Sequence, residues 1–336
     1  MINYVDYILE QAKNLLAIDS PSGYTAEVTA YLLEEYKRLG YKARLTGKGG
    51  VLADLGGEGE AILLAAHVDT LGGMVAEVKG DGRLRITNIG GMNANNVRIR
   101  TYDGACYDGT LQLIDASIHV NGKYSDTARS WDTVEVVIDE PVSSKEDVEK
   151  LGIMTGNFVC FDPRTTITSS GYIKSRFLDD KLSTAILLGY AKYLKDEYIT
   201  LPRKIYQHIT VFEEVGHGGC GSVPEGTVEF LSVDMGCVGN GLACTEREVS
   251  ICVKDSAGPY SYQTVTGLSR AAKENGIGFA ADVYPFYGSD ADAALRAGYD
   301  LRHGLIGPGV YASHGYERSH KDGVENTLKL LAAYIG

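Results

Sequence analysis

The sequence lacks long apolar segments, which limits where the protein can act. No apolar run approaches about 18 residues, so no membrane-spanning helix is predicted. The first ten residues carry acids and no basic stretch ahead of an apolar block, which is not the pattern of a secretory signal. We therefore expect a cytoplasmic protein without a membrane partner.

Cysteine, tryptophan and basic side chains are also scarce. The six cysteines form no CxxC pair, so we expect reduced core residues rather than disulfides. The single tryptophan, Trp131, leaves no platform of several tryptophans on which sugars could stack. With 32 basic against 44 acidic residues the net charge is −12, which argues against nucleic acid as a partner.

Length and hydrophobic pattern predict two domains. The 336 residues exceed what one core usually supports, about 250 to 300 residues. The run 61–66 is apolar throughout, as in a strand covered on both faces. Residues 72–139 instead show short alternating strands, one of them expected at 118–120, separated by Gly and Asn turns. We expect a discontinuous three-layer α/β/α domain at 1–70 and 164–336, and an inserted small all-β, barrel-like domain at 71–163.

The stretch 211–219, with the sequence VFEEVGHGG, calls for a chemical explanation. A β-branched, apolar strand delivers Glu213 and Glu214 to a glycine-rich turn. Adjacent carboxylates resist joint ionisation unless a cation or a shared proton lies between them. One Glu can ligate a metal while its neighbour serves as a general base toward water. Taken alone, the pair could also be a solvated surface turn.

Other acids and a histidine follow the ends of predicted strands. His67 and Asp69 are two residues apart at the end of the run 61–66, so both side chains can face one site. Asp179 and Asp180 open a helix, where capping would explain one acid but not two. Asp234 directly follows another apolar strand. Each has a structural alternative, but open α/β sheets place their sites at such strand ends.

The last third of the chain adds two histidines. Gly307-Pro308-Gly309 is predicted to turn the chain into a loop that contains His314 and His320. One His, one shared Asp and one further acid or His for each of two ions would make a dinuclear centre. Such nitrogen and oxygen ligands suit zinc, cobalt or manganese, and the absence of cysteine argues against a structural zinc.

These motifs resemble those of a known enzyme family. An HxD motif, a DD pair opening a helix, EEVG, an Asp after a strand and a late His occur in this order in the cytosolic metallo-aminopeptidases of the tetrahedral (TET) family, which includes glutamyl and leucyl aminopeptidases. The likeness covers nearly the whole chain, including the β insertion. It implies an aminopeptidase that hydrolyses the N-terminal residue from peptides with a free N-terminus. It also implies that the β domain is a dimerisation arm and that dimers assemble into a dodecamer.

The resemblance assigns residues to roles. It implies two divalent ions (Zn, Co or Mn) with five ligands: Asp179 bridging both ions, His67 and Asp234 on one, Glu214 and His320 on the other.

Four further residues receive roles by the same resemblance. Glu213 would be the general base and Asp69 the partner behind His67. Ser289 and Asp290 resemble the segment that lines the pocket for the first residue of the substrate. The family's late His is usually followed closely by Ser-Pro-Val-Glu, whereas Lys-Asp-Gly-Val-Glu follows His320 here. His314 is the less favoured candidate for the ligand position assigned to His320.

Three other functions fit some of these patterns. A two-metal deacylase or carboxypeptidase would need a basic residue facing the metals, and only Lys181 and Arg318 adjoin the expected ligands in sequence. A catalytically silent assembly or binding protein would not need the full ligand set together with both Glu213 and Glu214. A glycosidase needs carboxylates about 5 to 9 Å apart across a bond, which adjacent residues on one turn do not provide.

Overall fold

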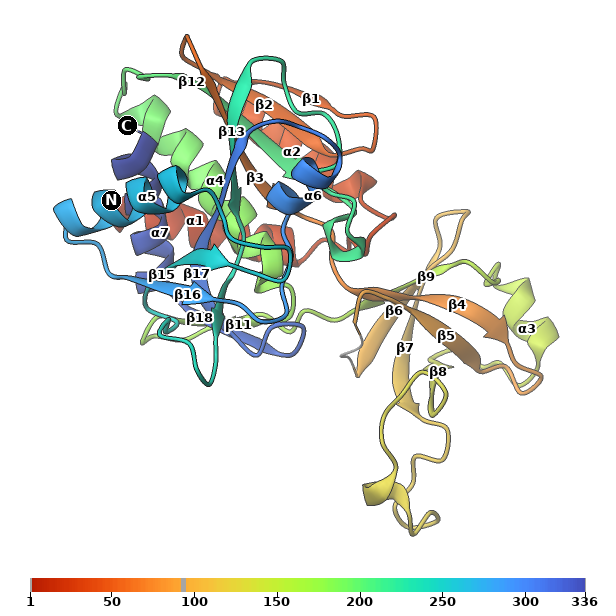
Figure 1. Ribbon diagram of the computed structural model, residues 1–336. Helices are drawn as coiled ribbons and strands as arrows, with labels where there is room; N and C mark the ends of the chain where they lie inside the picture. Colours follow the sequence, from red (N-terminus) through yellow and green to blue (C-terminus); the bar gives the residue numbers. More distant parts are fainter. Residues whose placement is uncertain (1, 92–94, 336) are drawn as a thin grey trace. The chain divides into compact units, whose positions relative to one another are not determined.

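The chain folds into two compact units in the computed structural model, which describes residues 2–91 and 95–335 (Figure 1). Unit 1 consists of Met1–Thr70 and Pro163–Gly336, and unit 2 of Leu71–Asp162. The six cysteines are free, in agreement with the expectation of reduced thiols. Among the described residues, no helix is both long enough and apolar enough to cross a membrane.

Unit 1 combines helices with one large mixed sheet. Its helices are α1 (Ile2–Leu16), α2 (Ala26–Arg38), α4 (Leu178–Asp196), the 3-10 helix η2 (Glu213–Val215), α5 (Tyr262–Glu274), α6 (Asp290–Arg296) and α7 (Lys321–Ile335). Its strands are β1 (Lys42–Leu45), β2 (Val51–Gly56), β3 (Ala61–His67), β10 (Thr166–Ile167), β11 (Tyr172–Ser175), β12 (Lys204–Thr210), β13 (Thr227–Val233), β14 (Gly236–Val238), β15 (Val249–Lys254), β16 (Phe279–Val283), β17 (Arg302–Tyr311) and β18 (Glu317–His320).

The centre of the sheet is parallel. Over the described residues, the main path of the twelve-stranded sheet runs β1-β2-β12-β3-β13-β17-β18-β11-β10. Strands β12, β3, β13 and β17 are mutually parallel, and the register pairs Thr210 with His67. All seven residues of β3 are buried, which confirms the central strand predicted from its apolar run. The carboxyl ends of these strands therefore meet at one edge of the sheet.

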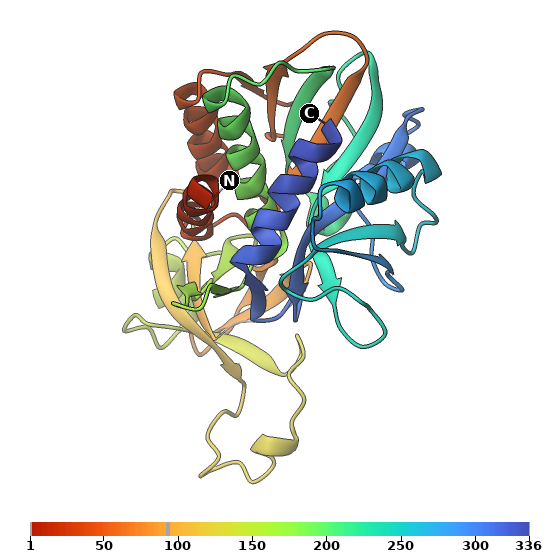
Figure 2. The ribbon, with the colours of Figure 1, turned by 90° about the vertical axis from the view of Figure 1, so that its left-hand side faces the viewer.

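The two faces of the central strands are covered differently. Figure 1 shows α1, α4 and α7 gathered on one side of β3 and β13, and α6 on the other. The face under α6 forms a core in which Ala291 and Ala294 pack against Leu63, Phe230 and Leu305. The α/β architecture expected from the sequence is confirmed. Figure 2 shows α5 and α7 side by side over the same part of the sheet.

The turn predicted at Gly307-Pro308-Gly309 is wrong, because β17 continues through it as a strand. The glycines serve close approach of neighbouring backbones instead. A Cβ atom on Gly307 would lie 1.6 Å from the carbonyl oxygen of Asp234, and one on Gly309 would lie 2.0 Å from that of Thr245. Only glycine fits at such distances, so Gly307 allows β17 to lie tightly against the segment that carries Asp234, and Gly309 allows it to lie against the segment that carries Thr245.

Unit 2 is a closed barrel with strand order β4-β5-β8-β7-β6-β9, in agreement with the predicted barrel-like domain. Its elements are β4 (Gly72–Val78), β5 (Leu84–Ile89), β6 (Asn96–Arg100), β7 (Cys106–Leu113), the 3-10 helix η1 (Tyr124–Asp126), β8 (Val134–Ile138), α3 (Lys145–Lys150) and β9 (Phe158–Phe161). The strand predicted at 118–120 is wrong, because these residues lie in the exposed loop between β7 and β8, which extends from the barrel in Figure 1.

Candidate metal centre and active site

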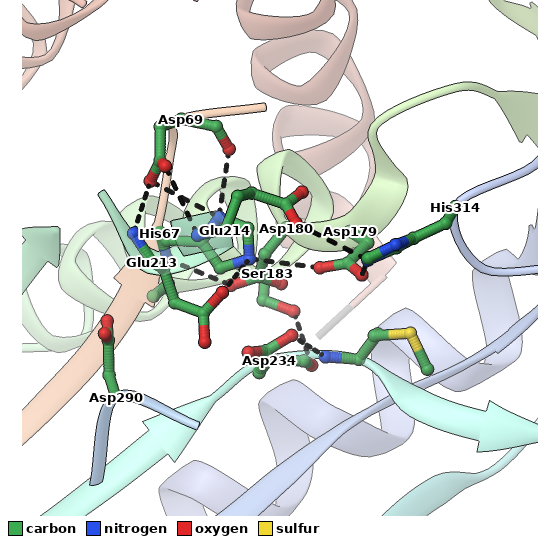
Figure 3. Close-up of polar contacts among 12 residues, drawn as sticks. His67, Asp69, Asp179, Asp180, Ser183, Glu213, Glu214, Asp234, Asp290 and His314 are labelled. Carbon is green, nitrogen blue, oxygen red and sulfur yellow. Dashed lines mark hydrogen bonds and ion pairs between the residues drawn. The ribbon is translucent and has the colours of Figure 1, made fainter. Parts of the chain in front are cut away.

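The expected acids and His67 come together at the carboxyl edge of the parallel strands. His67 is the last residue of β3, and Asp234 directly follows β13. Beyond the end of β12, the turn of η2 carries Glu213 and Glu214. Asp179 lies in the first turn of α4. The sheet edge predicted to hold the site does hold these five side chains, as Figure 3 shows.

The side chains form two potential metal-binding groups that share one residue. His67, Asp179 and Asp234 make the first group, and Asp179, Glu214 and His314 make the second. Within each group the ligand atoms lie within 4.8 Å of one another. The shared residue, Asp179, presents Oδ1 to His67 Nε2 at 3.0 Å and Oδ2 to His314 Nε2 at 3.4 Å. The two oxygens of Asp179 therefore face the two groups separately.

The ring of His67 is oriented by the backbone. Its Nδ1 lies 3.0 Å from the carbonyl oxygen of Asp69. A carbonyl oxygen only accepts, so Nδ1 must carry the proton, and in the neutral ring Nε2 keeps its lone pair for a metal. The sequence predicts the Asp69 carboxylate in this role, but its nearest oxygen lies farther from Nδ1, at 3.7 Å.

The Asp69 carboxylate instead holds the turn that carries the Glu pair. It accepts hydrogen bonds from the backbone N–H groups of Glu213 (3.2 Å) and Glu214 (3.4 Å), and from the hydroxyl of Ser22 (2.5 Å). The sequence predicts a turn at Ser22 and indicates no role for its hydroxyl. The only signal is its place in the Asp19–Gly23 turn, which does not reveal a contact with Asp69 47 residues away.

Asp179 and Asp180 point in different directions. The peptide bond between them is cis. Asp180 Oδ2 accepts a hydrogen bond from the backbone N–H of His67 (3.2 Å), so this carboxylate lies behind the cluster. Asp179 alone of the pair belongs to the two ligand groups. The geometry thus favours the first Asp of the pair as the shared residue.

The structure places His320 outside the cluster, and His314 takes the position expected of it. Strand β18 runs antiparallel to β17, so the chain moves away from the site edge as it approaches His320. The buried ring of His320 bonds the Ser170 carbonyl through Nε2 (2.8 Å) and accepts from the Asp322 N–H (3.1 Å). His314, in the turn between the two strands, has Nε2 3.4 Å from Glu214 Oε2.

Negative charge is concentrated in the cluster. Burial raises the pKa of Glu213 and Glu214 well above the usual range, and burial together with the charge of Asp179 raises the pKa of Asp234 to about 7. Burial would also raise the pKa of Asp179, but hydrogen bonds with His314 and His67 hold it below the usual range. Burial lowers the pKa of His67, yet its bond to Asp179 and the surrounding carboxylates outweigh this and raise it.

The donor set fits divalent cations. Buried carboxylates of this density either share protons or balance a positive charge. Glu214 Oε1 is buried and has no hydrogen-bond partner among the described residues. Mixed imidazole and carboxylate donors without cysteine suit zinc, cobalt or manganese. The two groups bring together four of the five residues expected as ligands, namely His67, Asp179, Glu214 and Asp234, and they contain His314 rather than His320.

Strained backbone surrounds the cluster. Phe177 and Phe212, which shortly precede the Asp and Glu pairs, have φ values of 68° and 69°. Ala312 and His314 both have φ 59°. Left-handed backbone at a residue other than glycine costs about 1 to 3 kcal/mol and is concentrated at functional sites. All four residues lie in the segments that carry the Asp pair, the Glu pair and His314.

A cavity of about 290 Å³ opens beside the two groups. Ser289, Asp290, Ala293 and Arg296 of α6 and its N-cap line it, together with Tyr287. Asp290 is buried, accepts from the Thr210 hydroxyl and leaves Oδ1 without a partner among the described residues. The Ser289 hydroxyl belongs to the capping box of α6. Both pocket residues expected from the sequence therefore reach the cavity, although Ser289 is engaged in the cap.

The fold and the site together define a class. An open α/β sheet whose carboxyl edge carries two carboxylate and imidazole groups sharing one Asp, with a further Glu beside a cavity, is the framework of a metal-dependent hydrolase. The profile of the M42 glutamyl aminopeptidase family matches residues 49–330, and the chain belongs to this family. It is therefore a metal-dependent aminopeptidase.

Individual relatives agree with this assignment. YhfE of Bacillus subtilis is 46% identical over 334 residues, which span 97% of this chain and 96% of YhfE. The TET1 peptidase of Pyrococcus horikoshii, which can assemble into a tetrahedron or a large octahedral shell, superposes with a TM-score of 0.86 at 24% identity, covering 98% of this chain and 99% of its own. The aminopeptidase APDkam598 of Desulfurococcus kamchatkensis has a TM-score of 0.87 at 23% identity, covering 99% and 95%. At sequence identities of 23% and 24%, the structural likeness shows that the three chains share a fold.

Proposed function

We propose that the chain uses two divalent cations to remove the N-terminal residue from peptides. His67, Asp179 and Asp234 would hold one cation, and Asp179, Glu214 and His314 the other. The observation that carries the proposal is the pair of ligand groups joined at Asp179, with Glu213 outside both groups and on the cavity wall. Zinc, cobalt and manganese all suit these donors.

Divalent cations at these positions would acidify water and polarise the scissile carbonyl. Glu213 is the general base. Its side chain is 17% exposed, with Oε2 3.7 Å from His67 Nε2, so it faces both the cluster and the cavity. Glu213 takes a proton from the attacking water as the oxygen adds to the carbonyl carbon. It then returns this proton to the amine that leaves when the C–N bond breaks.

Several residues keep this geometry in place. Asp69 fixes the Glu213–Glu214 turn through both backbone N–H groups, and Ser22 fixes Asp69. From the other side, Lys48 donates to the carbonyl oxygens of His217 and Gly218, which follow the Glu pair. A general base must hold its position within a fraction of an ångström, which these contacts provide.

The negative cavity supports a substrate with a free α-amino group. Asp290 adds a buried carboxylate beside the cluster, so a cationic amine is favoured there. The deacylase or carboxypeptidase alternative would need a cation turned toward the ligands. Lys181 instead donates to the carbonyls of Leu15 and Ile18, and Arg318 pairs with Glu246 at 3.0 Å. Arg296 is a cation on the cavity wall, so the N-acetylated substrates in the test below decide between the two functions.

The assembly and location follow as parts of the same proposal. We infer a cytoplasmic homo-oligomer in which unit 2 acts as the dimerisation arm and dimers build a dodecamer. The assembly of the TET1 peptidase supports this, since its chain shares this fold over nearly its whole length. Such an enclosed particle would admit peptides and exclude folded proteins.

The proposal is tested by metal reconstitution. The protein is stripped with a chelator, supplied separately with zinc, cobalt or manganese, and assayed on p-nitroanilides of Leu, Glu, Lys and Ala and on their N-acetylated forms. Restored cleavage of the free-amine substrates alone is expected. Glu213→Gln should bind both ions yet lose about 1,000-fold or more in kcat, since general base catalysis contributes about 10² to 10⁴.

The outcomes separate the alternatives. Cleavage of only acylated substrates would favour a deacylase. No cleavage with any metal would leave the silent binding protein as the better interpretation. A fully active Glu213→Gln variant would remove Glu213 from the mechanism.

A further inference from the structure

Glu317 is a buried carboxylate next to the cluster that belongs to neither ligand group. It is the first residue of β18 and is 2% exposed. Its Oε2 accepts a hydrogen bond from the backbone N–H of Asp179 (3.1 Å), and its Oε1 accepts from the backbone N–H of His314 (3.0 Å). The backbone N–H of Leu178 also donates to it. One carboxylate thus joins the start of α4 to the turn between β17 and β18.

Burying the carboxylate of Glu317 costs free energy, so its position calls for an explanation. Burial and the neighbouring Asp179 raise its pKa well above the usual range, and the backbone N–H groups oppose this shift. Part of its role is to cap α4, because the N-cap residue Phe177 makes no side-chain cap bond. Capping does not account for the second oxygen, which is bound to His314.

Both residues that Glu317 holds through its two oxygens belong to the same ligand group, Asp179–Glu214–His314. Asp179 has an additional restraint, since its Oδ1 is bonded to His67 Nε2. His314 lies in a turn with left-handed φ, and 52% of its side chain is exposed. The His314 ring in turn meets Asp179 Oδ2 at 3.4 Å, so each of the two residues has a side-chain contact besides its backbone bond to Glu317.

His67 and Asp234, the two residues that only the first group contains, are held by different contacts. His67 is fixed by β3 and by the carbonyl oxygen of Asp69. Asp234 is fixed by its own Oδ1, which accepts from the Met235 N–H (2.6 Å), and by its carbonyl oxygen, which accepts from the Ser183 hydroxyl (2.8 Å). Loss of Glu317 would leave these contacts in place.

We propose that Glu317 is the positioning residue for one of the two cations: it holds His314 and Asp179 so that their side chains converge with Glu214. The inference rests on the proposed two-metal function. In Glu317→Gln, the amide nitrogen cannot accept a hydrogen bond, so one of the anchored N–H groups loses its partner. Partners of this kind typically contribute about 10 to 100-fold to metal affinity.

The test measures binding of Co²⁺ to the chelator-stripped full chain, by competition titration with a chromophoric chelator and by visible absorption of bound Co²⁺. The matched control is Glu229→Gln. Glu229 is also 2% exposed, accepts from Arg203 Nη1 (2.7 Å) and Thr264 (3.1 Å), and lies near the start of β13, at the opposite end of that strand from Asp234. Glu229→Gln therefore measures how Co²⁺ binding responds to the loss of a buried carboxylate that lies away from the ligand groups.

We expect the wild type and Glu229→Gln to bind two Co²⁺ ions per chain. Glu317→Gln should weaken binding of the ion held by Asp179, Glu214 and His314 by about 10 to 100-fold, with an altered absorption spectrum. The other ion should be weakened less, because it shares only Asp179 with that group. Two ions bound by Glu317→Gln with wild-type affinities, or equal weakening of both, would overturn the inference. The same selective loss in Glu229→Gln would also overturn it. A wild type that binds fewer than two ions would instead contradict the proposed two-metal function.

Discussion

At the scale of single residues, the direction of the chain determines which of the two late histidines joins the candidate ligand groups. His314 and His320 are six residues apart, and a count along the sequence cannot choose between them. The hairpin of β17 and β18 distinguishes them, because Tyr311 pairs with Arg318 and His314 therefore lies in the turn at the site edge. His320 pairs with Tyr172 of β11 and packs its ring against that tyrosine at 4.7 Å.

This difference predicts opposite outcomes for two substitutions. His314→Ala should lower the affinity for one of the two metal ions and reduce kcat/KM by about 100-fold or more, because a direct ligand is lost. His320→Asn should keep kcat/KM within about threefold and lower the free energy of unfolding by about 1 to 2 kcal/mol, because buried hydrogen bonds are lost. Metal titration, steady-state kinetics and urea unfolding of both variants measure the metal affinity, kcat/KM and the free energy of unfolding. Loss of metal binding in His320→Asn with normal binding in His314→Ala would contradict the assignment.

A second residue-scale prediction concerns acid stability. His208 lies in β12, and burial, with the positive charges of Lys48 and Arg44, lowers its pKa to about 3. The folded state keeps this ring neutral, while the unfolded chain protonates it below the ordinary histidine pKa of 6.5. The free energy of unfolding therefore falls as the pH drops from about 6.5 to about 3, by about 1.4 kcal/mol per pH unit for this one proton. Above about pH 6.5 the contribution is constant.

In His208→Gln, unfolding is no longer coupled to the uptake of this proton. Over the two pH units below about 6.5, we expect the wild type to lose about 2 to 3 kcal/mol more than the variant. Urea unfolding followed by circular dichroism at several pH values measures the difference, and the carboxylates common to both proteins cancel. Parallel curves for the two proteins would show that His208 is not held neutral.

At the scale of elements, the Glu turn and helix α6 are fitted closely together. A Cβ atom on Gly218 would lie 2.1 Å from Asp290 Oδ1, and one on Gly219 would lie 2.0 Å from the Asp290 carbonyl oxygen. These two glycines allow the turn that carries Glu213 to lie directly on the first turn of α6. The distance between Glu213, the proposed general base, and the cavity wall therefore depends on the absence of side chains at Gly218 and Gly219.

Gly219→Ala should push the two elements apart. Overpacking against backbone costs about 1 to 3 kcal/mol, and the displaced Glu213 should lower kcat/KM by about 10-fold or more. Gly221→Ala is the matched control, because a Cβ atom there meets nothing within 4 Å. Urea midpoints and p-nitroanilide kinetics on both variants test the idea. Equal urea midpoints and equal kcat/KM in the two variants would mean that the contact between the Glu turn and α6 does not position Glu213.

The parts of this site that could be predicted are those attached to regular strands. The apolar run before His67 and the β-branched run before Glu213 locate strand ends, and parallel strands bring such ends together. Ser22 and Glu317 could not be predicted, because they act through hydrogen bonds across 47 and 138 residues of chain. The turn predicted at glycines 307 and 309 is wrong for the same reason, since only the neighbouring backbone shows that they serve close approach.

At the scale of the whole molecule, chemistry and the inserted barrel belong to different units. Every residue of the two ligand groups, together with Glu213 and the α6 wall, lies in unit 1. The chain enters unit 2 after Thr70 and returns at Pro163, so unit 2 interrupts unit 1 at one place in its sequence. Unit 2 has its own buried core inside a closed barrel, with Val75, Ile86, Val97, Leu111 and Val136 each at most 3% exposed.

This separation predicts that assembly can be removed while metal binding is kept. Replacing residues 71–162 by a flexible linker of about six Gly and Ser residues should leave a folded unit 1 that binds two Co²⁺ ions per chain. Light scattering after size-exclusion chromatography should give twelve times the chain mass for the full-length protein and a smaller species for the variant. A full-length monomer would contradict the proposed dodecamer, and a dodecameric variant would show that unit 1 carries the contacts. If the variant is folded by circular dichroism but binds no metal, the centre depends on unit 2, and unit 2 is then part of the catalytic machinery rather than an assembly arm.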